Sequence, residues 1–279
     1  MHISSEDFSI LHSDGLNGLT YLLFLPNFPF LILYLAPDMQ GWTVADRCFT
    51  YDDETFTKRD LLESERPTGW QGHPVKTPWS SVRLQNEHAA LAFIRDNTTI
   101  PVPKILEFKS ISSEGTYQLK MERVYGTPLS KIRAGKEQAT KAVDEYITQF
   151  VLPQLHSLRS RNVGALTGDI IPPMRLWGQP GSRQWTPWKS WSKTNVFVHN
   201  DLGQQNILVD DNFNVVGIVD WECSGFYPDY FEAPLWTKSL DDEGYFDIDA
   251  HNIPRLVEFL SQRERRPLWL RDSILSSFL

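Results

Sequence analysis

The chain has 279 residues, of which 41% are hydrophobic, and its formal net charge is −8 at pH 7. Its length suffices for one large domain or two lobes with a buried core, whereas its acidic balance argues against nucleic-acid binding, which needs a basic face. The only cysteines, Cys48 and Cys223, are too few for a disulfide framework or a cysteine zinc site, so we expect a reducing, cytoplasmic compartment.

An apolar run near the N-terminus, Leu19 to Ala36, is long enough to cross a bilayer. It is interrupted by Pro26, Asn27 and Pro29, and the segment before it carries acidic residues without Lys or Arg, the opposite of a signal peptide. We expect two buried apolar strands here, with a membrane anchor as the alternative.

Residues 48 to 58 read as two aromatic and β-branched runs around an acidic turn, which predicts a β-hairpin. Alternation on the second arm places Phe56 and Lys58 on one face. The following stretch, 61 to 81, is rich in Pro, Gly and charge and is expected to be a loop, with Lys76 near its end.

Residues 82 to 97 form an amphipathic pattern, with Leu84, Leu91 and Ile94 on one helical stripe. Glu87 falls within this stripe. A buried carboxylate is costly unless it is paired, so the position predicts a basic partner, unless Glu87 lies at the edge of the stripe and reaches water.

A strand is expected at 116 to 124, and the change to Gly126 and Pro128 marks a domain boundary. We therefore divide the chain into 1–124 and 125–279. A helix is expected at 136 to 160, kinked at Pro153. Its predicted apolar side consists of Ala142, Val143, Tyr146, Ile147 and Phe150.

The C-terminal half holds a long loop at 164 to 193, an acidic loop at 241 to 249 and a helix near 254 to 263. We expect the loop's tryptophans (Trp177, Trp185, Trp188 and Trp191) to serve core packing rather than ligand stacking.

Between these segments, His199, Asp201 and Asn206 have the spacing H-x-D-x-x-x-x-N. An Asp beside a substrate hydroxyl can accept its proton, and an Asn five residues later can offer an oxygen to Mg²⁺. His199 is expected to organise the loop rather than act as a base.

The runs 207–209 and 215–219 flank a turn and predict a second hairpin. If Val209 pairs near Val215, the antiparallel register brings Asn206 beside Ile218 to Asp220. Asn206 and Asp220 would then offer the oxygen ligands that suit Mg²⁺.

The stretch from Val196 to Pro234, which contains VHNDLGQQNILVDD and IVDWE, resembles the aminoglycoside phosphotransferase and choline kinase superfamily, in particular its fungal group. The upstream pieces FTYDDETFTKR, RLQNEHAALAFIRDNTTIPVPK and YQLKMERVYGTPL are similar to that group's first lobe and interlobe linker. The resemblance covers roughly Cys48 to Trp236.

This resemblance implies an α+β, protein-kinase-like bilobal fold and transfer of the γ-phosphoryl group of ATP or GTP to a hydroxyl of a small molecule. Asp201 would be the catalytic base, and Asn206 and Asp220 would bind Mg²⁺. Glu87 would pair with a lysine that contacts the phosphates, for which we prefer Lys58 over Lys76. Backbone groups near Glu122 and Val124 would hold the base of the nucleotide.

One departure from the family pattern supports a second reading. No glycine-rich phosphate loop precedes Cys48, and Ser13 to Gly18 is a weak candidate. The alternative is a catalytically impaired, kinase-like binding or scaffold protein. The acidic residues Glu222, Asp229, Glu232, Asp241 and Asp242 could favour an amine-bearing acceptor, but in a chain with 35 acidic residues we prefer to read them as a solvated acidic face.

Overall fold

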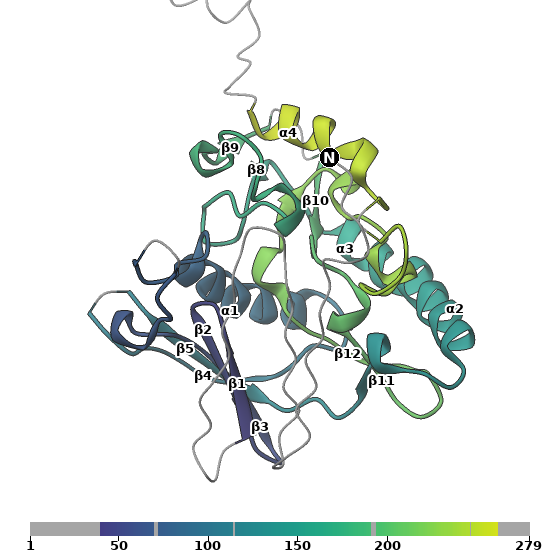
Figure 1. The fold of residues 1–279 in the computed structure, drawn as a ribbon. Coiled ribbons are helices and arrows are strands. Elements are labelled where there is room, and N and C mark those ends of the chain that lie inside the picture. Colours follow the sequence, from purple (N-terminus) through teal and green to yellow (C-terminus); the bar gives the residue numbers. More distant parts are fainter. Residues whose placement is uncertain (1–39, 70–71, 114, 191–193, 246, 262–279) are drawn as a thin grey trace, which may run out of the picture. The chain divides into compact units, whose positions relative to one another are not determined.

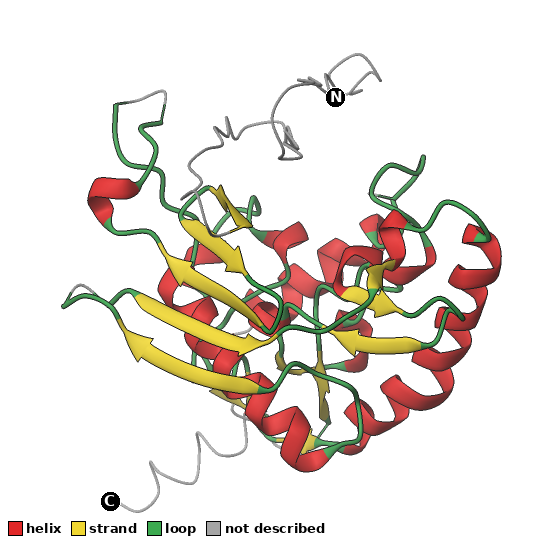
Figure 2. Ribbon diagram, turned by 90° about the horizontal axis from the view of Figure 1, so that it is seen from below, coloured by secondary structure: helices red, strands yellow, loops and turns green. Residues whose placement is uncertain are grey.

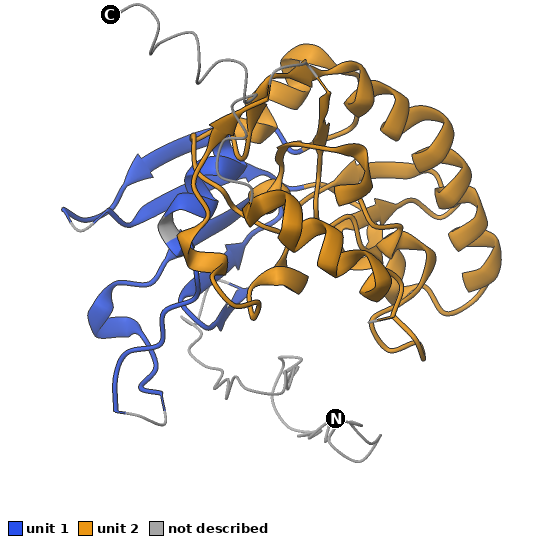
Figure 3. Cartoon of the chain, turned by 90° about the horizontal axis from the view of Figure 1, so that it is seen from above, with its two compact units in different colours: residues 1–88, 103–123 blue, residues 89–102, 124–279 orange. Residues whose placement is uncertain are grey.

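The structure is a computed structural model, and it describes residues 40–69, 72–113, 115–190, 194–245 and 247–261. The apolar run 19–36 and the glycine candidate 13–18 lie outside these residues. Within the described part of the chain, no helix is long and apolar enough to span a membrane. The chain divides into two compact units, residues 1–88 with 103–123 and residues 89–102 with 124–279 (Figure 3).

The first unit is built on a five-stranded antiparallel sheet with the strand order β1-β2-β3-β5-β4 (Figure 1). Its strands are β1 (Gln40–Val44), β2 (Arg47–Tyr51), β3 (Thr55–Asp60), β4 (Ile105–Ser110) and β5 (Tyr117–Glu122). The predicted hairpin is confirmed as β2 and β3, and its register places Phe49 opposite Lys58. Strand β1, which the sequence pattern did not reveal, pairs with β2 through a tight turn.

Helix α1 (Ser80–Asn97) confirms the amphipathic prediction, since Leu84, Leu91 and Ile94 are all buried. Its first half belongs to the sheet unit. Its second half belongs to the other unit, where Phe93 contacts the ring of Phe197 at a centroid distance of 5.1 Å. The interlobe boundary after Arg123 lies next to the predicted position, but residues 89–102 cluster with the second unit.

The second unit carries the other helices and several short strands (Figures 2 and 3). The helices are α2 (Lys136–Tyr146), α3 (Leu152–Ser157) and α4 (Ile253–Ser261). The strands form three small antiparallel sheets, with the orders β13-β10-β7, β12-β11-β6 and β8-β9. They are β6 (Thr127–Pro128), β7 (Arg159–Ser160), β8 (Asn162–Val163), β9 (Trp188–Lys189), β10 (Asn195–Val198), β11 (Ile207–Val209), β12 (Val215–Ile218) and β13 (Gly225–Tyr227).

The predicted break near Pro153 is present, because a π-helical turn at Ile147–Val151 separates α2 from α3. The predicted apolar side was partly wrong. Ala142 and Phe150 are exposed, and the buried positions recur every four residues. A spacing of four exceeds the 3.6 residues of an α-helical turn, and the wider π turn keeps the stripe on one side. The buried residues are Ala139, Val143, Ile147, Val151 and Leu155.

The segment 164–190 is mostly loop, as expected, and it packs on helix α4. Trp185 and Trp188 lie against a hydrophobic cluster that includes Tyr227, Phe231 and Leu256. Core packing is therefore the role of these two tryptophans, while Trp191 lies outside the described residues.

Candidate active site

The segment that follows β10 presents Asp201. Strand β10 is buried at every position, and the chain then turns through Asn200, whose φ of 69° lies in the left-handed region. The Asn206 side chain closes this turn, because its Nδ2 donates to the backbone oxygen of Asp201 at 2.8 Å and to Oδ2 of Asp201 at 3.1 Å. The Asp and the Asn of the H-x-D-x-x-x-x-N motif thus meet through direct hydrogen bonds. We call residues 199–206 the catalytic loop.

His199 is fully buried and organises this loop. Its Nδ1 accepts the amide hydrogen of Asp201 at 3.3 Å, so the other ring nitrogen carries the proton. That nitrogen, Nε2, lies 3.0 Å from the backbone oxygen of Val219 and donates to it. His199 therefore ties the catalytic loop to the end of strand β12, and both ring nitrogens are engaged in doing so.

The second hairpin has the predicted register. Val209 pairs with Val215 and Ile207 with Ile218, and the amide of Val219 donates to the backbone oxygen of Asn206 at 2.9 Å. Asn206 is thereby held beside the residue that precedes Asp220. Asp220 has a φ of 67°, an uncommon left-handed backbone for a residue with a side chain.

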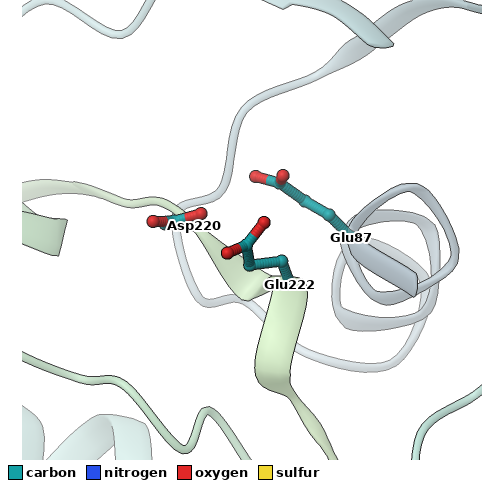
Figure 4. Close-up of side chains that lie close together, drawn as sticks. All are labelled: Glu87, Asp220 and Glu222. Atoms are coloured by element: carbon teal, nitrogen blue, oxygen red, sulfur yellow. The ribbon is translucent and has the colours of Figure 1, made fainter. Parts of the chain in front are cut away.

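Glu222 lies beside Asp220, in the 3-10 turn Trp221–Cys223 (Figure 4). Carboxylate oxygens of the two residues lie within 4.8 Å of one another. Burial raises the pKa of Asp201 well above its ordinary value, and the negative charges of Asp220 and Glu222 raise it further. Three carboxylates thus gather in the second unit, where a cation would relieve their repulsion.

The oxygen donors fit a hard divalent cation. Because Nδ2 of Asn206 is committed to Asp201, its amide oxygen is the atom that can bind a metal ion. Together with the carboxylate of Asp220, this gives the carboxamide and carboxylate oxygens that Mg²⁺ accepts, with no sulfur or imidazole donor of the kind zinc favours.

Glu232 is a site residue whose role the sequence did not reveal. Its carboxylate is buried and accepts the amide hydrogens of His199 and, at 3.1 Å, Asn200. The sequence places Glu232 among acidic residues that could face an amine-bearing acceptor, but its carboxylate contacts the backbone of the catalytic loop instead. Burial raises its pKa to about 7, against the opposing effect of the two amides and Arg175. No spacing rule links a residue to amides 33 positions earlier.

In the first unit, Lys58 and Glu87 form the ion pair that the position of Glu87 demands. The Nζ atom of Lys58 donates to both carboxylate oxygens of Glu87, at 2.7 and 2.9 Å. Both residues are buried. Lys76, the other candidate partner, is exposed in the loop before α1. The pairing itself is thus observed with Lys58, and contact with phosphates stays a prediction.

Glu122 ends β5, and Val124 follows at the boundary of the units. The amide of Glu122 donates to the backbone oxygen of Lys104 at 2.8 Å, and the amide of Arg123 to that of Glu54 at 2.8 Å. These two amides are engaged within the sheet unit. That backbone groups near Glu122 and Val124 hold a nucleobase stays a prediction.

The model of the phosphotransferase enzyme family matches residues 182–233, the segment that holds Asp201, Asn206, Asp220 and Glu232. Among solved structures, an aminoglycoside-3'-phosphotransferase of type VIII aligns at 17% identity with a TM-score of 0.47, over 87% of this chain and 90% of that chain. An aminoglycoside phosphotransferase from Streptomyces rimosus, solved with ADP and streptomycin, aligns at 15% identity with a TM-score of 0.46, over 82% of this chain and 87% of that one. Among curated proteins, none matches the chain.

Proposed function

We propose that the chain is a Mg²⁺-dependent phosphotransferase of the aminoglycoside phosphotransferase and choline kinase superfamily, a proposal that the match of residues 182–233 to the phosphotransferase enzyme family supports. Its reaction would move the γ-phosphoryl group of ATP or GTP to a hydroxyl group of a small molecule. The observation that carries the proposal is the pair of hydrogen bonds from Asn206 to Asp201, in a hairpin whose register holds Asn206 next to the Val219–Asp220 turn.

Each residue has a defined task in this reaction. Asp201 orients the acceptor hydroxyl and takes its proton while the oxygen forms a bond to the γ-phosphorus and the bond from that phosphorus to the bridging oxygen breaks. The raised pKa of Asp201 suits a group that must receive a proton. Asn206 and Asp220 would hold Mg²⁺, which when bound neutralises charge on the phosphates. Lys58, held by Glu87, would contact those phosphates.

The test is a phosphoryl-transfer screen over aminoglycosides, choline, ethanolamine, sugars and small hydroxy metabolites, with either nucleotide. We expect Mg²⁺-dependent nucleotide binding in a thermal-shift assay and transfer to at least one acceptor. Asp201→Ala should lower turnover by about 10²- to 10⁴-fold, the usual contribution of a general base, and should leave nucleotide binding in place. A chain that binds neither nucleotide in the presence of Mg²⁺ would contradict the proposal.

A second candidate function rests on the turn between β1 and β2, the place where a phosphate loop would lie. This turn contains Ala45 and Asp46, without glycine, and both residues are buried. The carboxylate of Asp46 accepts hydrogen bonds from the amide and the hydroxyl of Thr77, at 3.0 and 2.7 Å. A turn that lacks glycine and is held in place by hydrogen bonds favours a kinase-like protein that binds a ligand without turnover. Nucleotide turnover that Asp201→Ala abolishes would exclude it.

A further inference from the structure

Arg175 contacts three separate segments of the second unit, although it belongs to none of the motifs above. It lies in the 3-10 turn Met174–Leu176, and its side chain is mostly buried. The guanidinium donates from Nε to Oδ2 of Asp249 at 2.8 Å, from Nη2 to the backbone oxygen of Phe231 at 2.7 Å and from Nη1 to the backbone oxygen of Asn200 at 3.3 Å. The planar, forked guanidinium group offers five N–H donors in a fixed geometry, which suits three acceptors that lie on separate segments.

Two contacts of Arg175 bear on Asn200, the residue before Asp201. One is made to Asn200 itself, and the other is made next to Glu232. The amide of Asn200 donates to Glu232, while the carbonyl of Asn200 accepts from Arg175. The residue before Asp201 is therefore held at both its backbone polar groups. Phe231, whose backbone oxygen also accepts from Arg175, is the neighbour of Glu232 in the chain. Arg175 is therefore linked to Glu232, the other side chain that holds Asn200, and we call this set of contacts the clamp.

The third contact ties the segment 239–249 to the same clamp. Besides the ion pair of Asp249 with Arg175, this segment carries Tyr245, whose buried ring packs with Ala233 and Leu235. The hydroxyl of Tyr245 is hydrogen-bonded to the side chain of Gln205 and lies in the electrostatic field of Asp201. Asp249 and Tyr245 thus attach the segment to the catalytic loop at two points, through Arg175 before Asp201 and at Gln205 after it.

We propose that Arg175 is a positioning residue, which fixes Asp201 through the carbonyl of Asn200 and, through Asp249, joins the segment 239–249 to the catalytic loop. The proposal rests on the proposed phosphotransferase function. It makes the segment 239–249 part of the acceptor side of the site, because its attachment points flank the residue that receives the acceptor's proton. Loss of the clamp would displace Asp201 without removing any group that contacts the nucleotide.

The test compares Arg175→Gln, Arg175→Lys and Asp249→Asn, with Leu256→Ala as a control that perturbs the core of the same unit. We expect Arg175→Gln to lower kcat by about 10- to 100-fold, the effect of a small misplacement of a reacting group, with the nucleotide Kd unchanged. Arg175→Lys should not restore kcat, since an ammonium group lacks the fork, and Asp249→Asn should give a smaller loss. In an Asp201→Ala background, Arg175→Gln should add less than about twofold, because effects through a shared group are non-additive. Full additivity, or an equal kcat loss in Leu256→Ala, would overturn the proposal.

Hydrogen exchange separates this proposal from the function on which it rests. In the protein without ligands, Arg175→Gln should speed amide exchange in peptides covering 197–203 and 239–245, and Leu256→Ala should speed it mainly elsewhere. If the wild-type chain proves unable to bind nucleotide, the proposed function fails while this measurement still tests the clamp. Unchanged exchange in both peptides would contradict the role of Arg175.

Discussion

Lys58 and Arg59 are neighbours on strand β3, yet their ion pairs differ sharply in burial. The side chains of Lys58 and Glu87 are 8% and 1% exposed, whereas those of Arg59 and Glu65 are 28% and 37% exposed. A buried charge that loses its partner cannot be solvated, while an exposed one is taken up by water. The two positions therefore form a matched pair for testing what the buried pair contributes to stability.

Lys58→Ala should lower the free energy of unfolding by about 3 to 5 kcal/mol, since it leaves Glu87 buried without its cation. Arg59→Ala should lower it by no more than about 1 kcal/mol, as is usual for exposed pairs. Urea unfolding of both variants measures the difference. If the two variants lose stability equally, the Lys58–Glu87 pair is more exposed in solution than the structure shows.

At the residue scale, the position of Asn206 beside the Val219–Asp220 turn was predictable from the hairpin register, while the chemical roles of Asp201 and Asn206 stay predictions. Glu87 was predictable for another reason, since a carboxylate within an apolar stripe demands a partner. Arg175 and the role of Glu232 were not predictable. Their backbone partners belong to residues 25 to 56 positions away, and backbone groups leave no mark on the sequence. The side-chain partner of Arg175, Asp249, lies 74 positions away.

At the scale of elements, the backbone of strand β13 lies close to the backbone of Gly164. The amide of Phe226 donates to the backbone oxygen of Gly164 at 2.8 Å, and the amide of Gly164 donates back to Phe226 at 3.0 Å. A Cβ atom on Gly225 would lie 2.4 Å from that oxygen of Gly164. Because the obstacle is backbone on both sides, a side chain at this position requires the strand to move.

Gly225→Ala should therefore lower the free energy of unfolding by about 1 to 3 kcal/mol, as overpacking does in cores. Gly178→Ala provides the control, because a Cβ there would meet no atom within 4 Å. This control should be neutral or stabilising by up to about 1 kcal/mol, through the reduced freedom of the unfolded chain. Thermal and urea unfolding of both variants measures the effects, and a neutral Gly225→Ala would show that β13 can shift at no cost.

For the whole molecule, the sequence predicted the α+β class, the order of the main elements and a boundary near residue 124. Two features of the fold were not predicted, strand β1 and the assignment of residues 89–102 to the second unit. Strand β1 has five residues, and its large apolar side chains, Trp42 and Val44, are exposed, so its sequence does not mark a buried face. The assignment of residues 89–102 to the second unit depends on packing such as that of Phe93 on Phe197. The assignment of residues 89–102 depends on contacts with distant residues, and such contacts are decided by tertiary structure rather than by local pattern.

The pKa values of buried carboxyl groups are raised in both units, and this makes the stability of the whole chain depend on pH. Burial raises the pKa of Asp60 in the first unit, against the effect of Arg47, and raises that of Glu232 in the second to about 7. Between the ordinary pKa of such a group and its raised value, the folded chain holds a proton that the unfolded chain has released. The free energy of unfolding therefore decreases as the pH rises through this window.

For Glu232 the window runs from 4.5 to about 7, and a change of this size corresponds to about 3 kcal/mol. In Glu232→Gln this decrease should disappear, so the variant's stability should depend less on pH between 5 and 7 than that of the wild type. Urea unfolding at closely spaced pH values, with a chelator present to remove divalent cations, measures both curves. Glu258→Gln, an exposed position on α4, should run parallel to the wild type. Parallel curves for wild type and Glu232→Gln would mean that Glu232 stays ionised in the folded chain, stabilised by the two amides of the catalytic loop that donate hydrogen bonds to it.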